Sequence, residues 1–431
     1  MTIDRREFLK AASAQTGLLA VSGRPAAADP SGGQRVRAAQ PAPEAVVIGA
    51  GAFGAWTAFH LRKLGAQVTL VDAWGPGNSR STSGDETRGI RSSYGNSGTA
   101  ELWITWARKA MQYWQAFDDE WGRQMGAQLF FRTGDLIFRE KPEVFTQKTM
   151  EWWKKLGIRH ETPSVDDVLR AYPVLKLDKI GFVLHEPDAG VVRARRSCQI
   201  VADALQRLGG KVVIGHARLG DINGRRLDSV QLAGPFGFAR GAIFVFALGP
   251  WFPKFFPELM GRRLTTPLGH VHYFGTPPGD DRFSFPNLPS YNFPGVTGWP
   301  ALTPDNRGFR VRWRGAQLFD PDSSNRAFER KHDKHARKLL KDRFPLLEKA
   351  PLLETRSCHY EFSASNNFII DRHPDFDNVW LAGGGSAEGF KFGPVVGEYT
   401  AKRVLGDEGD PEVAEGFSLK MSDPDAVTGQ A

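Results

Sequence analysis

Three glycines at fixed spacing define the first candidate site. Gly49, Gly51 and Gly54 form a GxGxxG motif directly after the apolar run 45–48. In such a motif the first glycine allows a tight turn, the second lets the backbone approach a pyrophosphate, and the third allows close helix–strand packing. The N-terminus of the next helix then presents free N–H groups to the phosphates. The motif indicates a dinucleotide site, and we expect Phe53 to contact the dinucleotide.

The elements that must position this turn follow from the same stretch. Residues 45–48 predict a short buried strand, and residues 55–64 predict a helix. Residues 67–71 predict a second strand, which Asp72 closes. The Asp72 carboxylate is expected to accept hydrogen bonds from ribose hydroxyls, which favours an unphosphorylated ribose. This complete context separates the motif from a glycine-rich turn of some other α/β protein.

Composition limits the alternatives. The chain has 431 residues, 41% hydrophobic and 24% charged, which is enough for two interleaved domains around a large core. Two cysteines, Cys198 and Cys358, exclude a thiolate metal cluster and a disulfide framework, and no metal site is expected. Cys198 falls in a predicted helix, 197–208, where packing is the expected role. Part of the net charge of +8 lies in residues 326–343. Apolar residues there favour a solvated helix over a nucleic-acid face, so no nucleic-acid partner is expected.

The first residues have the pattern of an export signal. Arg5 and Arg6 precede a short, weakly apolar run, and small residues follow at 26–28. The arginine pair resembles a twin-arginine signal, read by machinery that exports folded proteins. The alternative is an ordinary basic N-terminus. The run is too short for a stable membrane span. We predict a signal over 1–28, a linker over 29–43, and a periplasmic or secreted protein.

Four further segments resemble the D-amino-acid-oxidase superfamily, specifically its monomeric sarcosine oxidase and N-methyltryptophan oxidase branch. In chain order they are STSGDETRGIR (81–91), ALGPW (247–251), CHY (358–360) and residues 368–398. The resemblance covers essentially everything after Glu44. It implies FAD as the cofactor, a choice that the glycine motif alone leaves open between FAD and NAD.

The resemblance implies an α/β fold in which a Rossmann-like FAD-binding domain is interleaved with a mostly antiparallel substrate (cap) domain. The expected FAD-binding segments are 44–120, 186–265 and 351–410. The expected substrate-domain segments are 121–185 and 266–350, with a C-terminal tail over 411–431. Residues 211–214 and 243–246 read as further strands of the cofactor domain, and the aromatic stretch 267–313 suits an antiparallel cap.

The resemblance also assigns residues around the flavin. Cys358 matches the cysteine that bonds covalently to the flavin ring, while a buried free cysteine is the alternative. Arg356 and His359 are candidates, by sequence proximity, for the cation that lowers the pKa of its thiol. Arg88 matches a residue beside the flavin ring, where a fixed cation stabilises the reduced anionic flavin.

Glycines near the C-terminus complete the cofactor set. Gly384 and Gly385 are expected to bring backbone close to the flavin. A helix beginning after Pro394 would point its N–H groups at the pyrimidine end. Leu219 is expected to contact the cofactor as well.

The substrate residues follow from the same resemblance. Lys391 matches the lysine that holds the substrate carboxylate and contacts the cofactor, and Arg91 matches its partner. The alternative is a structural salt bridge to a carboxylate such as Glu398 or Glu388. Tyr360 matches an active-site tyrosine that hydrogen-bonds the substrate or lines its pocket.

Two departures from the family concern the chemistry. Arg310 stands where relatives carry a lysine that promotes reaction with oxygen, and its planar head is not equivalent to an ammonium. Thr297 stands where relatives often place a tyrosine. The first departure leaves the identity of the electron acceptor open. The second means that the pocket differs in detail from that of a sarcosine oxidase, so sarcosine is not named as the substrate.

The expected reaction is FAD-dependent oxidation of a small amine or amino acid, and the substrate class we favour is a carboxylated secondary or N-methyl amine. Hydride transfer to the flavin, imine hydrolysis and reduction of oxygen to hydrogen peroxide would complete it. One alternative is an exported dehydrogenase that uses a quinone or a protein acceptor. Another is a non-catalytic flavin-binding protein. A flavin hydroxylase would need NADPH, and no second nucleotide motif is present.

Overall fold

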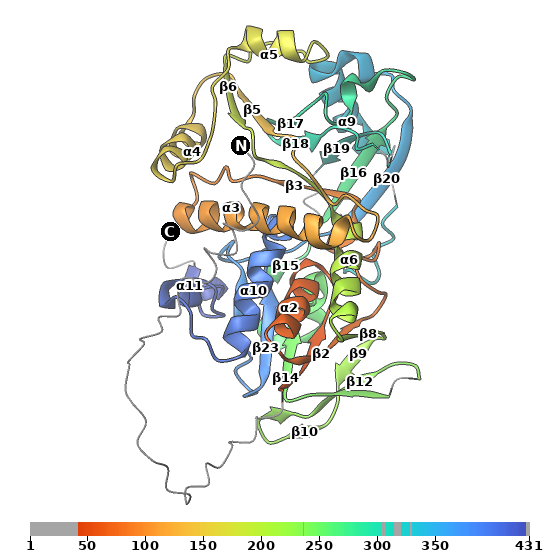
Figure 1. Ribbon diagram of the computed structural model, residues 1–431, viewed down its shortest axis with the longest axis vertical. Helices are drawn as coiled ribbons and strands as arrows, with labels where there is room; N and C mark the ends of the chain where they lie inside the picture. Colours follow the sequence, from red (N-terminus) through yellow and green to blue (C-terminus); the bar gives the residue numbers. More distant parts are fainter. Residues whose placement is uncertain are drawn as a thin grey trace, which may run out of the picture. The chain divides into compact units, whose positions relative to one another are not determined.

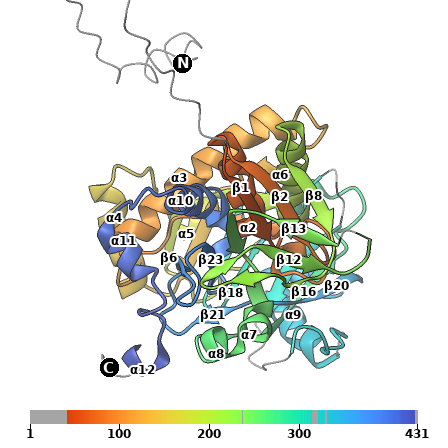
Figure 2. The ribbon, with the colours of Figure 1, turned by 90° about the horizontal axis from the view of Figure 1, so that it is seen from below.

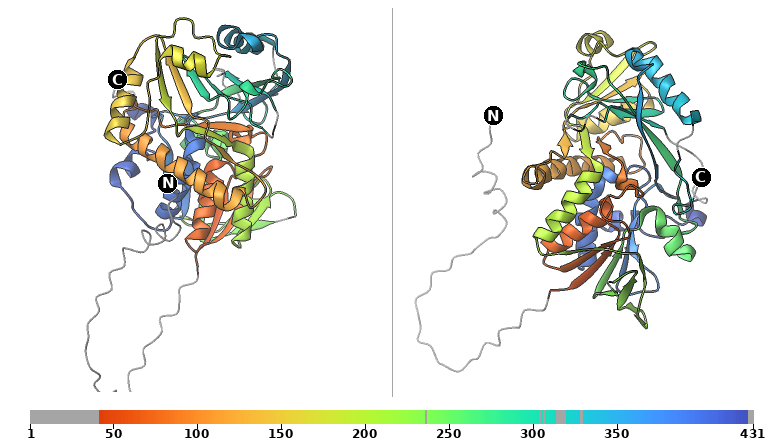
Figure 3. Two further views of the ribbon diagram at one scale, coloured as in Figure 1. Left: turned by 45° about the horizontal axis from the view of Figure 1, so that its top comes forward. Right: turned by 90° about the vertical axis from the view of Figure 1, so that its right-hand side faces the viewer.

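The computed structural model describes residues 42–427 except 236, 304, 306, 314–319, 328 and 329. The predicted export signal, residues 1–28, lies outside the described residues, as does most of the linker. From Ala42 onward the chain forms one compact unit built on two large sheets. Figures 1 and 3 show these sheets with the long helix α3 (Ala100–Phe117) crossing between them.

The first sheet has six strands in the order β22-β23-β14-β1-β2-β8. All neighbours pair in parallel except β22 with β23. Its central strands β1, β14 and β23 are apolar because both of their faces are covered, whereas the edge strand β8 is partly exposed. The four strands predicted at residues 45–48, 67–71, 211–214 and 243–246 are confirmed, and the observed bounds are β1 (Glu44–Ile48), β2 (Gln67–Asp72), β8 (Lys211–Ile214), β14 (Ile243–Phe246), β22 (Ile369–Arg372) and β23 (Val379–Gly383).

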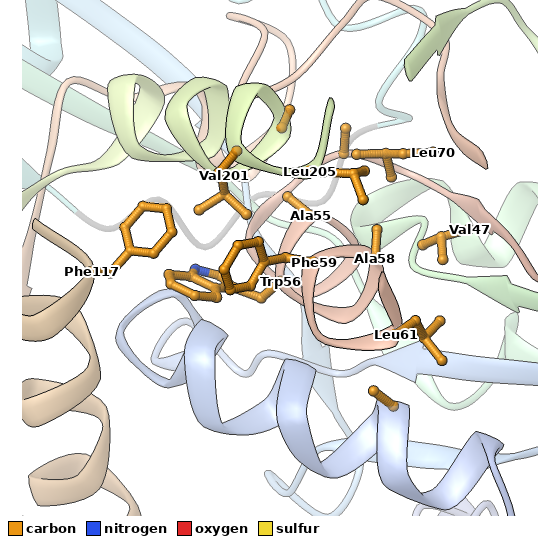
Figure 4. Close-up of a cluster of buried hydrophobic side chains, with 14 of the residues drawn as sticks. Val47, Ala55, Trp56, Ala58, Phe59, Leu61, Leu70, Phe117, Val201 and Leu205 are labelled. Atoms are coloured by element: carbon orange, nitrogen blue, oxygen red, sulfur yellow. The ribbon is translucent and has the colours of Figure 1, made fainter. Parts of the chain in front are cut away.

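Alternating side chains of these strands enter two different cores. Val47 points toward α2 (Ala52–Lys63), α6 (Ala194–Arg207) and α10 (Gly393–Val404), where Trp56 packs against Phe117 (Figure 4). Val46 and Ile48 point the other way. They meet the small sheet β13-β12-β9, visible beside the strands in Figure 2, with bounds β9 (Ala217–Leu219), β12 (Ser229–Leu232) and β13 (Phe238–Arg240).

The second sheet has seven strands in the order β20-β16-β19-β18-β17-β5-β6. It is antiparallel except for the pair β17–β5, as the mostly antiparallel cap predicted. The predicted substrate segment ended at residue 350, but the edge strand β20 follows that residue. It belongs to this sheet because it pairs with β16 along its whole length. The bounds are β5 (Asp135–Arg139), β6 (Phe182–Glu186), β16 (Leu268–Phe274), β17 (Ser290–Phe293), β18 (Val296–Trp299), β19 (Phe309–Trp313) and β20 (Leu352–His359).

Smaller elements join the two sheets. The basic stretch predicted as a solvated helix is α9 (Arg330–Arg343), and Leu340 and Phe344 are buried on its inner side. The predicted helix around Cys198 is α6, in which Cys198 is 3% exposed and packs. The other elements are β3 (Thr87–Ile90), α4 (Val144–Lys155), α5 (Val165–Ala171), β4 (Phe130–Phe131), β7 (Gly190–Arg193), β10 (Ile222–Asn223), β11 (Arg226–Leu227), α7 (Phe252–Phe255), α8 (Pro257–Met260), β15 (Leu264–Thr265), β21 (Phe362–Ser363), α11 (Pro411–Gly416) and α12 (Pro424–Val427).

Candidate active site

A cavity of about 340 Å³ lies where the two sheets meet. Its volume is in the range of ligand-binding sites. Gly49, Gly51 and Asp72 line one part of it, and Cys358 and Tyr360 line another. The cavity therefore connects the glycine turn to the segments that the sequence analysis assigned to the flavin.

The glycine turn has the close backbone packing that its motif requires. Gly49 has φ +105°, and a Cβ there would lie 2.2 Å from the carbonyl oxygen of Ala247. A Cβ on Gly54 would lie 1.8 Å from the carbonyl oxygen of Gly49, whereas one on Gly51 would meet Ser83 Oγ at 3.2 Å. The helix α2 begins directly after this turn, and Gly51 and Phe53 line the cavity. The turn thus fits a bound pyrophosphate at a helix N-terminus.

Asp72 lines the same part of the cavity and holds the turns around it. One carboxylate oxygen accepts from the N–H of Ala50 at 2.7 Å, and the other accepts from the N–H groups of Trp74 and Gly75, each at 2.9 Å. Burial raises the pKa of Asp72, and these three donors oppose that rise. Its predicted contact with ribose hydroxyls stays a prediction.

A buried carboxylate, Asp85, joins the seven-stranded cap sheet to the segment that leads into β3. Arg310 Nη2 donates to it at 2.6 Å, Tyr273 donates at 3.1 Å, and Arg88 forms a second ion pair with it. Burial alone would raise the pKa of Asp85, but Arg310 and Arg88 outweigh burial and hold that pKa well below its ordinary value. Two arginines predicted to lie near the flavin are thus fixed by one acid, and both line the cavity.

Arg310 itself is 1% exposed and lies over the ring of Trp299 at 4.3 Å. Its Nε and Nη1 atoms have no hydrogen-bond partner among the described residues. Buried donors of this kind are costly to leave unsatisfied. Because Arg310 lines the cavity, these N–H groups fit a bound group that accepts hydrogen bonds.

Arg88 lies beside Cys358, with its Nη2 3.9 Å from Sγ. The two candidates chosen by sequence proximity, Arg356 and His359, contact other residues. Arg356 pairs with Glu86 at 2.8 Å and with Glu354 at 2.6 Å. His359 contacts other residues, including Ser324 Oγ at 2.6 Å.

The Lys391 ammonium is already hydrogen-bonded inside the protein. Its Nζ donates to Tyr94 Oη at 2.6 Å, to the backbone oxygen of Glu388 at 3.1 Å and to Glu388 Oε2 at 2.5 Å. Arg91 Nη2 lies 3.7 Å from the other Glu388 oxygen. The alternative of an ion pair with Glu388 is therefore present, while Glu398 pairs with Lys109. Carboxylate binding by Arg91 and Lys391 stays a prediction.

Burial and neighbouring charges also change the pKa of Lys391. Burial lowers the pKa of Lys391 to about 8, against the opposing effect of Glu388. Lys391 and Arg91 do not line the large cavity; Arg91 lies at a small recess that Asp135 and Trp299 also line. The helix predicted to follow Pro394 is α10, which begins at Gly393 with Pro394 in its first turn, where proline is favoured.

The remaining predicted site residues, Tyr360 for the substrate and Gly384, Gly385 and Leu219 for the cofactor, divide into two groups. Gly385 and Tyr360 line the cavity. Gly384, with φ +69°, and Leu219 do not line it. Leu219 instead packs in the core between the six-stranded sheet and the small sheet, opposite Val230.

Glu361 and Arg312 are two charged residues among the cavity-lining residues that the sequence analysis did not identify. Glu361 is 8% exposed; its Oε1 accepts from the N–H of Gly385 at 2.9 Å, and Oε2 has no partner among the described residues. Burial raises the pKa of Glu361 to about 7. Arg312 lies two residues after Arg310 on β19, and both line the cavity. Side chains two residues apart on a strand point to the same face, so the prediction that Arg310 lies near the flavin could have been extended to Arg312.

Two other kinds of site were sought in the part of the chain that the structure describes. It contains no cluster of three or more His, Cys, Asp or Glu side chains arranged to hold a metal ion. None of its helices combines the length and the apolar character needed to cross a membrane.

Comparisons with known proteins show the family of this chain. The profile of a family described as FAD dependent oxidoreductase (DAO) matches residues 44–403. Monomeric sarcosine oxidase from Bacillus sp. (strain B-0618) is 26% identical over 84% of this chain and 92% of its own length. N-methyl-L-tryptophan oxidase from Yersinia pestis (strain Pestoides F) is 24% identical over 87% of this chain and 98% of its own length.

A solved structure shares the fold. L-proline dehydrogenase from P. horikoshii superposes with a TM-score of 0.74 at 18% identity, covering 88% of this chain and 97% of its own. The matched family spans both large sheets, including the glycine turn, Cys358 and Lys391. The chain therefore belongs to the DAO family of FAD-dependent oxidoreductases.

Proposed function

We propose that the protein oxidises a small amine that carries a carboxylate, preferably a secondary or N-methyl amine, with oxygen as the electron acceptor. The observation that carries this proposal is the cavity that joins the glycine turn to Cys358, Tyr360 and the arginine pair held by Asp85. The sarcosine and N-methyltryptophan oxidases among its relatives support the substrate class.

The residues of this chain would bind and orient both FAD and the amine substrate. The turn at Gly49 and the N-terminus of α2 fit the pyrophosphate of FAD, which when bound supplies the acceptor for a hydride. Arg88 and Arg310 would stabilise negative charge that develops during the reaction, because Asp85 fixes them in advance. An amine that binds deprotonated needs no strong base, so orientation by Tyr360 and the cap is the main contribution.

In the proposed overall reaction, an amine, water and oxygen give a carbonyl compound, a shorter amine and hydrogen peroxide. A second candidate is a dehydrogenase that passes the electrons to a quinone or a protein. The observation that favours it is the ion pair of Arg310 with Asp85, because this acid offsets the positive charge that would otherwise assist oxygen.

Anaerobic titration of the purified holoprotein tests this function. We expect the visible flavin absorbance to bleach with carboxylated secondary or N-methyl amines and to return when air is admitted. Bleaching without fast return would select the dehydrogenase. A folded yellow protein that bleaches with no amine would refute amine oxidation and would favour a non-catalytic flavin protein.

We propose further that FAD is attached covalently through Cys358. The support is that Cys358 lines the cavity and has Arg88 beside its sulfur. After acid precipitation, flavin should remain with the wild-type polypeptide, whereas Cys358→Ala should release it to the supernatant. Cys198→Ala is the matched control and should retain it. Release of flavin from the wild type would show that no covalent link exists.

We also propose export through the twin-arginine machinery, supported by the Arg5-Arg6 pattern at the start of the chain. Fractionation of cells should find the wild type in the periplasm or the medium. The double change Arg5→Lys and Arg6→Lys should retain it in the cytoplasm. An unchanged distribution would exclude this route.

A further inference from the structure

Glu361 combines deep burial with a carboxyl oxygen that has no partner. The residue is 8% exposed and lines the large cavity. Its Oε1 accepts from the N–H of Gly385 at 2.9 Å, whereas Oε2 has no hydrogen-bond partner among the described residues. A buried polar oxygen is costly to leave unsatisfied. Oε2 therefore fits a hydrogen bond to the group that fills the cavity beside it.

The position of this carboxyl group favours the cofactor as that group. Gly249 follows β14 and Gly385 follows β23, and these strands lie side by side with β1 in the parallel part of the six-stranded sheet. A Cβ on Gly249 would lie 3.8 Å from Oε2, and one on Gly385 would lie 3.3 Å from Oε1. The carboxyl group thus lies at the carboxyl ends of β14 and β23, beside the strand that leads into the glycine turn. In open α/β sheets, ligands bind at this edge.

The main chain holds Glu361 in this position. Its carbonyl oxygen accepts from the N–H of Ala387 at 3.1 Å, so the backbone and the side chain both bond to the turn that follows β23. Cys358, three residues earlier, lines the same cavity and is the proposed attachment point of the flavin. Glu361 therefore lies in the part of the cavity that joins Cys358 to the edge of the cofactor sheet.

The charges around this carboxyl group decide how it titrates. Burial raises the pKa of Glu361 to about 7, and the N–H groups of Gly385 and Gly384 oppose that rise. On the turn after β23, Glu388 and Lys391 pair with each other. The charged or titratable side chains that line the cavity from neighbouring elements are Arg88 on β3, His270 on β16, Arg310 and Arg312 on β19, and Cys358 and Tyr360. The cations Arg88 and Arg310 share the carboxylate of Asp85, which offsets part of their charge.

We propose that Glu361 hydrogen-bonds bound FAD through Oε2 and takes up a proton when the flavin is reduced. Reduction brings two electrons and one proton to the flavin as a hydride equivalent and leaves a negative charge there. A second negative charge close to the carboxylate is unfavourable, so Glu361 binds a further proton from solvent and becomes the neutral acid. Reoxidation returns that proton to solvent. The inference requires only that FAD is bound, and it holds whichever compound supplies the electrons.

Redox titration of the holoprotein at a series of pH values counts these protons. Dithionite reduces the flavin in the presence of a reference dye, and the visible absorbance gives the midpoint potential. Uptake of one proton per two electrons lowers the midpoint potential by about 30 mV per pH unit, and uptake of two lowers it by about 60 mV per pH unit. Below pH 7 Glu361 is already protonated, so we expect the steeper slope in the wild type above about pH 7. Because dithionite supplies the electrons, this test stands even if no amine is oxidised.

Glu361→Gln keeps the size of the side chain but cannot titrate. This variant should follow the slope of about 30 mV per pH unit throughout, so its potential should match the wild type below pH 7 and exceed it above. Asp322→Asn is the matched control, because Asp322 also lines the cavity but accepts from Trp251 at 2.7 Å and pairs with Lys254 at 2.5 Å. Burial of Asp322 is outweighed by Lys254 and Trp251, which hold its pKa below the ordinary value. Asp322→Asn should therefore keep the wild-type slope.

Infrared difference spectroscopy identifies the group that takes up the proton. Reduction of the wild type should add the carbonyl band of a protonated carboxyl group, and this band should shift in D2O and be absent from Glu361→Gln. Burial lowers the pKa of Lys391 to about 8, so Lys391 can also change charge in this range, but an ammonium has no carbonyl band.

Three results would overturn the inference. They are a wild-type slope of about 30 mV per pH unit at every pH, no carboxyl band on reduction of the wild type, or a slope and band that persist in Glu361→Gln. Flavin content and melting temperature verify that each variant is folded. If Glu361→Gln does not retain FAD, Glu361→Asp should shift the carboxyl band, and an unchanged band would likewise overturn the inference.

Discussion

Asp85→Asn is expected to lower the free energy of unfolding by about 3–5 kcal/mol, the range for removing one partner of a buried ion pair. The change would leave Arg310, which is 1% exposed, without the carboxylate that now accepts its hydrogen bond at 2.6 Å. Arg88 would lose the same partner beside Cys358. Urea unfolding of the holoprotein measures the effect, and we expect weakened FAD retention with it.

A double-mutant cycle separates the ion pair from the general effect of the substitution. Asp85→Asn combined with Arg310→Met should cost less than the sum of the two single changes, because the double variant no longer leaves the buried Arg310 charge without its carboxylate, and only the more exposed Arg88 loses its partner. Asp188→Asn is the comparison variant. Asp188 also pairs with two arginines, Arg108 and Arg159, but its side chain is partly exposed, so its loss should lower the free energy of unfolding less. A loss below about 1 kcal/mol for Asp85→Asn, as expected of an exposed pair, would contradict the role given to Asp85.

Gly54→Ala is expected to abolish FAD binding and to destabilise the fold by about 3 kcal/mol or more, beyond the usual cost of overpacking. The added Cβ would lie 1.8 Å from the carbonyl oxygen of Gly49, so α2 must move away from the turn. That movement would displace the N–H groups that fit the pyrophosphate. Thermal unfolding and the ratio of flavin to protein absorbance measure the two effects.

Gly51→Ala is the matched control because it adds the same methyl group three residues earlier. Its Cβ would meet the Ser83 side chain at 3.2 Å, a contact that a small shift of that hydroxyl can relieve. This variant should fold with a stability near that of the wild type and lose affinity for FAD only. Equal melting temperatures for Gly54→Ala and the wild type would refute the close-packing argument.

The sequence by itself determined the first strand–helix–strand unit of the cofactor-binding sheet. The strands at 45–48 and 67–71, the helix between them and Asp72 lie within one short stretch, so local periodicity and turn chemistry were sufficient. The structure places α2 from Ala52 to Lys63, slightly earlier than the predicted 55–64, because its first turn overlaps the glycine motif. The mostly antiparallel cap was implied by the family resemblance, and the aromatic stretch broken by proline and glycine was consistent with it.

Tertiary structure decided which charged groups meet. Sequence proximity suggested Arg356 or His359 beside Cys358, but the chain brings Arg88 there from 270 residues away. The pairing of Arg310 with Asp85 spans 225 residues and likewise has no local signal. Lys391 could have faced a substrate or a neighbouring acid; in the folded chain it donates to Glu388, three residues earlier, and to Tyr94 from a distant segment. Strands and turns can be predicted from local patterns because they depend on residues that are close together in the sequence. The partner of a buried charge depends instead on which distant segments the folded sheets bring within contact.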